Sequence, residues 1–160
     1  GYVPDQGEGL YRRSLYTFWK RTIAPPFMIN FDSPSRETCT VRETRTNTPL
    51  QALNLMNDET FLEASRKLAE RMMNEGGETA EQRLDYAYHL VLARAPQPNE
   101  RRILLTALHS FEQRYGTDSQ SAEAFLSYGA SPRTSNAASL APYTAVASMM
   151  LNLDEAVTKQ

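Results

Sequence analysis

Helix start signals recur along this chain, and they constrain its fold more than any other sequence feature. The clearest is TPLQ at residues 48–51. Thr48 can cap a helix by accepting a hydrogen bond from the Gln51 backbone, while the Gln51 side chain returns to the Thr48 backbone. The intervening proline suits the first helical position, where its missing N–H is no loss. Thr79 and Gln82 repeat the capping pattern, so two helices begin with strong local signals.

Apolar residues keep a spacing of three and four residues across most of the remaining chain, as helices with one buried face require. Caps, prolines and glycines divide this pattern into expected helices at residues 58–75, 79–95, 97–115 and about 119–128, then a last helix that carries Tyr143, Val146, Met150, Leu153 and Val157. No stretch shows the sustained period of two that is typical of a strand. We therefore predict an all-α fold, a single irregular helical bundle of about five to six helices.

The N-terminal part of the chain gives weaker signals. Residues 10–22, LYRRSLYTFWKRT, place Tyr11, Leu15 and Phe18 at helical spacing, which predicts a short amphipathic helix that faces the core. The prolines of APPFMINFDSPS follow, and they favour a long proline-rich loop that reaches to about residue 48. Long loops in compact domains are often functional or are fixed by side-chain hydrogen bonds. The polar start, residues 1–9, is expected to be flexible.

Composition excludes several classes of protein. With 160 residues, 41% of them apolar and 22% charged, the chain fits one globular domain, and no apolar run approaches the ~20 residues of a membrane span. Cys39 is the only cysteine, so an internal disulfide, a paired-cysteine zinc site and covalent haem through C-x-x-C-H are all excluded. His89 and His109 have no partner at ligand spacing. We expect no metal and no cofactor in this chain, and a packed, inert Cys39 thiol.

One polar cluster is a candidate ligand site. Arg36, Arg42, Arg45 and Asn47 precede the helix that starts at residue 49. Together with the N–H groups at the helix start, they could hold a carboxylate, phosphate or sulfate group. Pro49 weakens this interpretation, because it removes one of those donors.

A structural interpretation of the same cluster is the alternative, and we favour it. The arginines would pair with neighbouring carboxylates, while Thr46, Asn47 and Thr48 satisfy backbone groups of the loop. The carboxylates nearest in the sequence are Asp32, Glu37 and Glu43. Under this interpretation the cluster holds the proline-rich loop in place.

Three blocks of the chain are long and specific: RRSLYTFWKRTIAPPFMINFDSPSRETC, RTNTPLQALNLMND and YTAVASMMLNLDE. They resemble the C-terminal part of domain-of-unknown-function family 1553, over about residues 12–155. The resemblance implies the C-terminal portion of a large planctomycete-type polypeptide with cytochrome-c-like domains. Haem would then lie in a separate domain, the neighbouring domains would be the partners, and the location would be extracytoplasmic, in the periplasm or cell envelope. It supplies no catalytic residues.

The leading hypothesis is a non-catalytic helical structural or interaction module of such a polypeptide. The alternative is a ligand-binding or catalytic subsite for an anionic or carbohydrate substrate, with the arginine cluster as its contacts. A weaker alternative is nucleic-acid binding by residues 11–21, where basic and aromatic residues are interleaved. We expect no nucleic-acid partner, because these aromatic residues share one helical face and the net charge is −2.

Overall fold

Helices make up the regular structure throughout the described part of the chain. The computed structural model describes residues 3, 5, 7–20, 23–34, 37, 39 and 46–158. Within these ranges there is no strand, and an isolated bridge joins Lys20 to Ile23. The all-α prediction is confirmed.

The contacts divide the chain into two units, Gly1–Asn54 and Leu55–Gln160. The sequence predicts one domain. That stays a prediction, and it is tested by whether the chain unfolds in one cooperative step.

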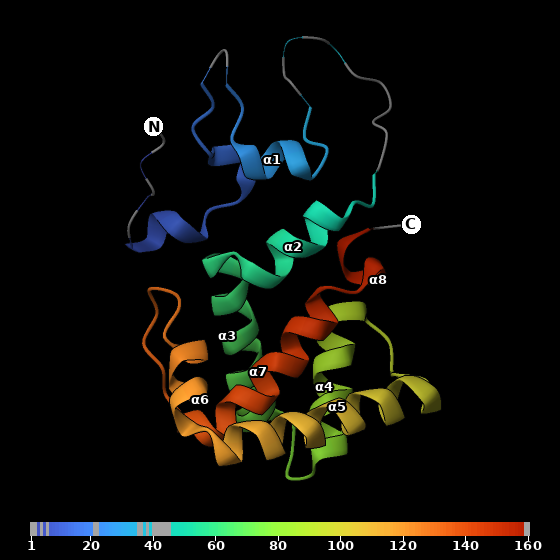
Figure 1. Cartoon of the computed structure of the whole chain (residues 1–160). Helices are drawn as coiled ribbons and strands as arrows, with labels where there is room; N and C mark the ends of the chain where they lie inside the picture. The colour runs from blue at the N-terminus through green and yellow to red at the C-terminus, as the bar shows by residue number, and fades with distance from the viewer. Residues whose placement is uncertain are drawn as a thin grey trace. The chain divides into compact units, whose positions relative to one another are not determined.

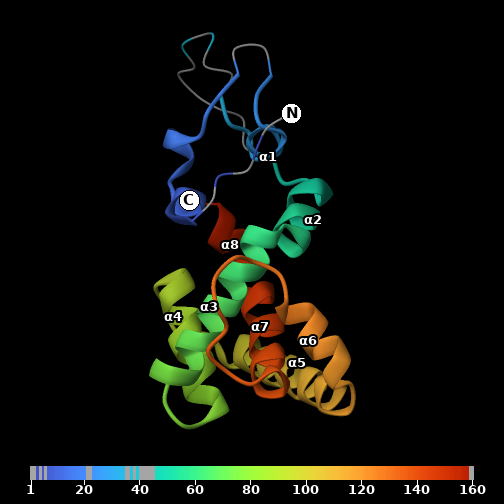
Figure 2. The same ribbon diagram turned by 90° about the vertical axis from the view of Figure 1, so that its left-hand side faces the viewer.

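The second unit is a helical bundle built around α7 (Ala137–Leu151). Its other helices are α3 (Glu59–Glu75), α4 (Ala80–Leu92), α5 (Pro98–Thr117), α6 (Ser119–Leu126) and the short α8 (Asp154–Val157). Figures 1 and 2 show α3, α5 and α6 beside α7, with α4 next to α3.

α7 occupies the centre of this bundle because its sequence is apolar on every side. All positions from 140 to 147 are buried, and the side chains of Leu140 and Met150 are fully enclosed. A helix with one apolar face needs one neighbour, whereas a helix of this composition has to be surrounded. The inner faces of α3, α4 and α5 close over it with Met72, Leu84 and Leu108.

The predicted helix starts in the second unit are confirmed. Thr79 Oγ1 accepts from the Gln82 N–H (3.3 Å), and Gln82 Oε1 accepts from the Thr79 N–H (3.2 Å). Asp58 caps α3 by accepting from the Thr60 N–H (2.9 Å). Local capping signals therefore locate these helices correctly.

The last predicted helix is wrong in one respect, because it is broken in two. α7 ends at Leu151, and Leu153 takes an extended conformation (φ −68°, ψ 139°) before α8 begins. Leu153 and Val157 therefore do not continue the buried stripe of α7. The reason is tertiary: Glu155 on α8 is bound by Arg94 from the turn between α4 and α5, and periodicity along the chain does not reveal such a partner.

The first unit is built from short elements. Its described part contains two 3-10 turns, η1 (Gly7–Tyr11) and η2 (Ser14–Tyr16), then α1 (Pro26–Asn30) and the start of α2 (Pro49–Asn57). α1 is a single helical turn within the predicted proline-rich loop. α2 begins where the TPLQ signal predicts.

The amphipathic helix predicted for residues 10–22 is wrong in its described part. Residues 7–20 include no buried side chain, and Tyr11, Leu15 and Phe18 are 58%, 73% and 72% exposed. A helix of this length is marginal in water unless one face packs against something. The segment therefore forms turns in place of a continuous helix.

Candidate functional site

Most of the predicted ligand site lies outside the described residues. This applies to Arg36, Arg42 and Arg45. Asn47 is described, is exposed, and directly precedes the capping residue of α2. The anion pocket and the alternative pairing of the arginines with carboxylates both stay predictions.

The described part of this cluster fixes loop backbone through Asp32 and Thr46. The Thr46 N–H donates to Asp32 Oδ2 (2.6 Å), and the Thr46 hydroxyl donates to Oδ1 (2.8 Å). The hydrogen bond from the Thr46 backbone has the largest effect on Asp32 and lowers its pKa, and the hydrogen bond from the Thr46 hydroxyl lowers it further. Asp32 has a left-handed backbone (φ 54°), which aspartate adopts more readily than most residues. Its carboxylate therefore ties a tight turn to the segment before α2.

The capping box at the start of α2 is present and also reaches α1. The Gln51 N–H donates to Thr48 Oγ1 (3.3 Å), and Gln51 Oε1 accepts from the Thr48 N–H (3.0 Å). Gln51 Nε2 donates to the Asn30 carbonyl at the end of α1 (2.8 Å). Thr48 thus satisfies a backbone N–H of the helix start, as the structural interpretation predicts, whereas the hydroxyl of Thr46 bonds to the side chain of Asp32.

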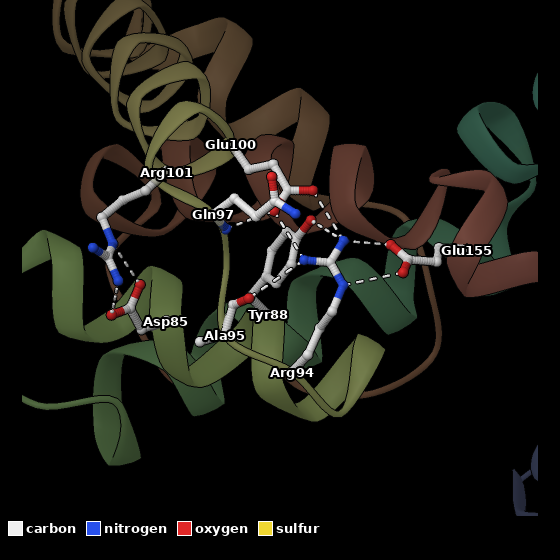
Figure 3. Close-up of polar contacts among 8 residues, drawn as sticks. All are labelled: Asp85, Tyr88, Arg94, Ala95, Gln97, Glu100, Arg101 and Glu155. Carbon is white, nitrogen blue, oxygen red and sulfur yellow. Dashed lines mark hydrogen bonds and ion pairs between the residues drawn. The ribbon is translucent and has the colours of Figure 1, made fainter.

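In the second unit, Arg94 joins three helices through its side chain (Figure 3). Its Nη1 and Nη2 donate to the two carboxylate oxygens of Glu100 on α5 (both 2.9 Å). On the other side, Nε and Nη2 donate to Glu155 on α8 (3.0 and 2.6 Å). Nη2 also donates to the hydroxyl of Tyr88 on α4 (3.3 Å), whose ring lies 5.0 Å from the guanidinium. These contacts are two bidentate pairs, the strongest arrangement available to arginine and carboxylate.

The same contacts hold both carboxylates in the ionised form. The hydrogen bond from Arg94, followed by that from the Gln97 N–H, lowers the pKa of Glu100 to about 2. Arg94 also lowers the pKa of Glu155, and burial raises the pKa of Tyr88. A general acid or base works best with a pKa near the working pH. The Arg94 network is therefore suited to holding helices together and not to proton transfer.

A second polar cluster lies along α3 and holds the loop between α6 and α7. We call Glu63, Arg66, Lys67 and Glu70 the α3 clamp. Spacings of three and four residues place them on one side of the helix. Glu63, Arg66 and Glu70 are buried (6%, 4% and 6% exposed). Figure 2 shows the loop, drawn in orange, passing over α3.

The clamp binds the loop mainly through its backbone. Glu63 accepts from the N–H groups of Ala130 (2.7 Å) and Ser131 (3.2 Å). Arg66 donates to the carbonyls of Leu126 (3.1 Å) and Ser131 (2.7 Å). Arg66 Nε is buried and has no hydrogen-bond partner among the described residues, so the clamp carries a cost as well as a gain.

Glu70 and Lys67 hold the next part of the loop. Glu70 accepts from the Thr134 N–H (3.2 Å) and from Lys67 Nζ (2.8 Å), which also donates to the Pro132 carbonyl (2.9 Å). Burial by itself would raise the pKa of Glu70, but the hydrogen bonds from Lys67 and Thr134 outweigh it and leave the pKa lowered. The carboxylate is thus kept ionised in a buried position.

Sequence reasoning missed both networks. The charged residues at positions 63, 66 and 70 have the spacing of a helix face, and that spacing could have indicated a buried polar stripe. Arg94 gave no comparable signal, because Glu155 lies 61 residues away in the sequence.

Three further expectations concern chemistry and location. Within the part of the chain that the structure describes, no group of three or more His, Cys, Asp or Glu residues is placed to hold a metal ion. None of the described helices has both the length and the apolar character needed to cross a membrane.

The prediction of a packed Cys39 thiol is wrong, because Cys39 is exposed. It lies in the first unit, where the described residues bury few side chains.

The fold and these networks define an all-α bundle whose charged groups hold helices and loops. The chain matches the family described as PSD1, protein of unknown function (DUF1553), over residues 1–108 and therefore belongs to it. The matched residues include the first unit, α3 and α4, while the third resembling block, at residues 143–155, lies outside them. Comparisons with curated proteins and with solved structures give no match.

Replacing Gly129 with alanine should destabilise the protein and weaken the clamp. Gly129 has φ +95°, and a Cβ there would lie 2.8 Å from the Glu63 carboxyl carbon. A left-handed backbone costs an alanine ~1–2 kcal/mol, and the clash adds to this because Glu63 has to leave the loop. Urea unfolding of the variant and the parent chain measures the loss.

Gly116→Ala is the matched control for this measurement. A Cβ at Gly116, in the last turn of α5, would meet no atom within 4 Å. The exchange should be neutral or stabilising by up to about 1 kcal/mol, because glycine weakens helices. Equal stability of the two variants would contradict the close contact between the loop and Glu63.

The free energy of unfolding should decrease as the pH falls from about 4.5 to about 2. The pKa of Glu100 is lower in the folded chain than its ordinary value, so its contribution is complete above the ordinary value and is lost as the pH falls through the folded one. Chemical denaturation across this pH range measures the slope, which Glu100→Gln should reduce. A slope that Glu100→Gln does not alter would assign the effect to other carboxylates.

Proposed function

We propose that this chain is a non-catalytic helical structural and interaction module. In this proposal the second unit is a stable scaffold, and the first unit docks on a neighbouring domain of the same, larger polypeptide. The difference in how the two units are built supports it.

The observation that carries the proposal is that the first unit buries very little. Among its described residues only Met28 and Gln51 are buried, whereas Leu15, Phe18 and Ile29 are 73%, 72% and 57% exposed. A segment of this size has to bury substantial apolar surface to offset the conformational entropy that it loses on ordering. Exposed apolar groups of this kind are typical of interaction sites. A neighbouring protein surface would supply the missing burial.

The second unit supports the scaffold part of the proposal. Two sets of its charged groups, the Arg94 network and the α3 clamp, hold helix ends and loop backbone. Glu100 has a pKa of about 2, far from the range useful in proton transfer near neutrality. These groups stabilise the bundle and present no poised acid, base or nucleophile.

The partner domains in this proposal are those of the large cytochrome-containing polypeptides that the resemblance indicates. Haem would belong to a separate domain of that polypeptide, and the module would function outside the cytoplasm, in the periplasm or cell envelope. The proposal assigns no cofactor and no nucleic acid to this chain.

Amide hydrogen exchange tests the proposal. In the 160-residue chain alone, residues 7–20 should exchange fast while α3 and α7 are protected, because a segment without a core opens easily. In the full-length polypeptide that contains the chain, residues 7–20 should exchange at least about tenfold more slowly. Equal protection of residues 7–20 and α7 in the chain alone, or no gain of protection in the full-length protein, would rule out docking.

A further inference from the structure

Residues 11–20, the docking segment, combine exposed apolar side chains with positive charge. Their sequence, YRRSLYTFWK, contains two arginines and a lysine and no acidic residue. Arg12 and Arg13 are exposed. Leu15, Tyr16 and Phe18 are 73%, 65% and 72% exposed. Aromatic side chains and arginine are among the residue types enriched in protein interfaces.

Local hydrogen bonds give the docking segment a defined shape. The Tyr16 N–H donates to the Arg13 carbonyl (2.9 Å), and the Thr17 N–H donates to the Ser14 carbonyl (3.1 Å). This 3-10 turn carries Leu15 and Tyr16, with an arginine pair directly before it. A preformed turn reduces the entropy that binding would otherwise cost.

We propose that the docking segment binds an apolar protein surface whose rim carries carboxylates, on a neighbouring domain. This inference rests on the proposed docking function and adds the chemistry of the partner. Leu15, Tyr16 and Phe18 become buried in the apolar centre of the interface, while Arg12 and Arg13 pair with the acidic rim. The absence of acidic residues within the segment makes such a rim complementary along its whole length.

The conformation of the segment favours a protein partner over an anionic membrane surface. Segments that lie in a membrane interface are typically amphipathic helices, which satisfy their own backbone hydrogen bonds. Within the docking segment the structure has the end of η1 and the η2 turn in place of a continuous helix.

The charge of the segment also argues against a second copy of the chain as the partner. A two-fold symmetric contact places the same surface patch on both sides. It would bring Arg12 and Arg13 of one copy against identical charges of the other, which is unfavourable. An acidic partner surface removes this repulsion.

The test measures hydrogen exchange of residues 7–20 in the full-length polypeptide for three variants. The first, Arg12→Glu with Arg13→Glu, reverses the charge. The second, Leu15→Asp with Phe18→Asp, removes apolar contacts. The third, Arg102→Glu, alters an exposed arginine of α5 as the control. Charge reversal should speed exchange of residues 7–20 by about tenfold, since it replaces two attractions with two repulsions, and the control should not.

Each other outcome is decisive. If the apolar variant speeds exchange and charge reversal does not, the acidic rim is wrong and the proposed docking function stands. If neither variant alters exchange, both proposals fail.

Sedimentation of the 160-residue chain with phosphatidylglycerol vesicles is an independent test of the partner. Binding that Phe18→Asp abolishes would overturn the protein partner in favour of a lipid surface, whereas no binding supports the protein partner.

Discussion

The α3 clamp is the interaction on which the arrangement of the bundle depends. α7 is buried along most of its length and is stable only when the other helices surround it. Burying Glu63, Arg66 and Glu70 costs much desolvation free energy. That cost is offset because the carboxylates accept loop N–H groups and Arg66 donates to loop carbonyls. The clamp thereby satisfies backbone groups of the loop. It also fixes the position of the loop that leads into α7.

The Arg94 network joins helices through ion pairs between side chains. The turn after α4 presents one guanidinium to Glu100 and Glu155, so that α5 and α8 are held by a single residue. Both networks use charged side chains to hold helices and a loop in place. The first unit has no such interior among its described residues. Its contacts are a carboxylate–loop pair, Asp32 with Thr46, and the local capping box of Thr48 and Gln51. Its exposed apolar side chains are the observation that supports the proposed docking on a neighbouring domain.

Sequence reasoning succeeded where the determining interactions are local. The capping boxes at Thr48 and Thr79 and the end of α3 before Gly76 depend on residues within one or two turns. It failed for the helix at residues 10–22, because periodicity shows which face could be buried but not whether a neighbour covers it. The Arg94–Glu155 pair and the contacts of α3 with the loop join residues that are about sixty apart in the sequence, and only tertiary structure brings them together.

The central claim is that the chain joins a rigid scaffold to a segment that has no core of its own. Backbone ¹⁵N relaxation of the 160-residue chain tests it most directly. The account predicts order parameters of about 0.85 along α3, α5 and α7 and lower values in residues 11–20. Uniformly high values through residues 11–20 would show that the segment is already packed in this chain, and they would contradict the account.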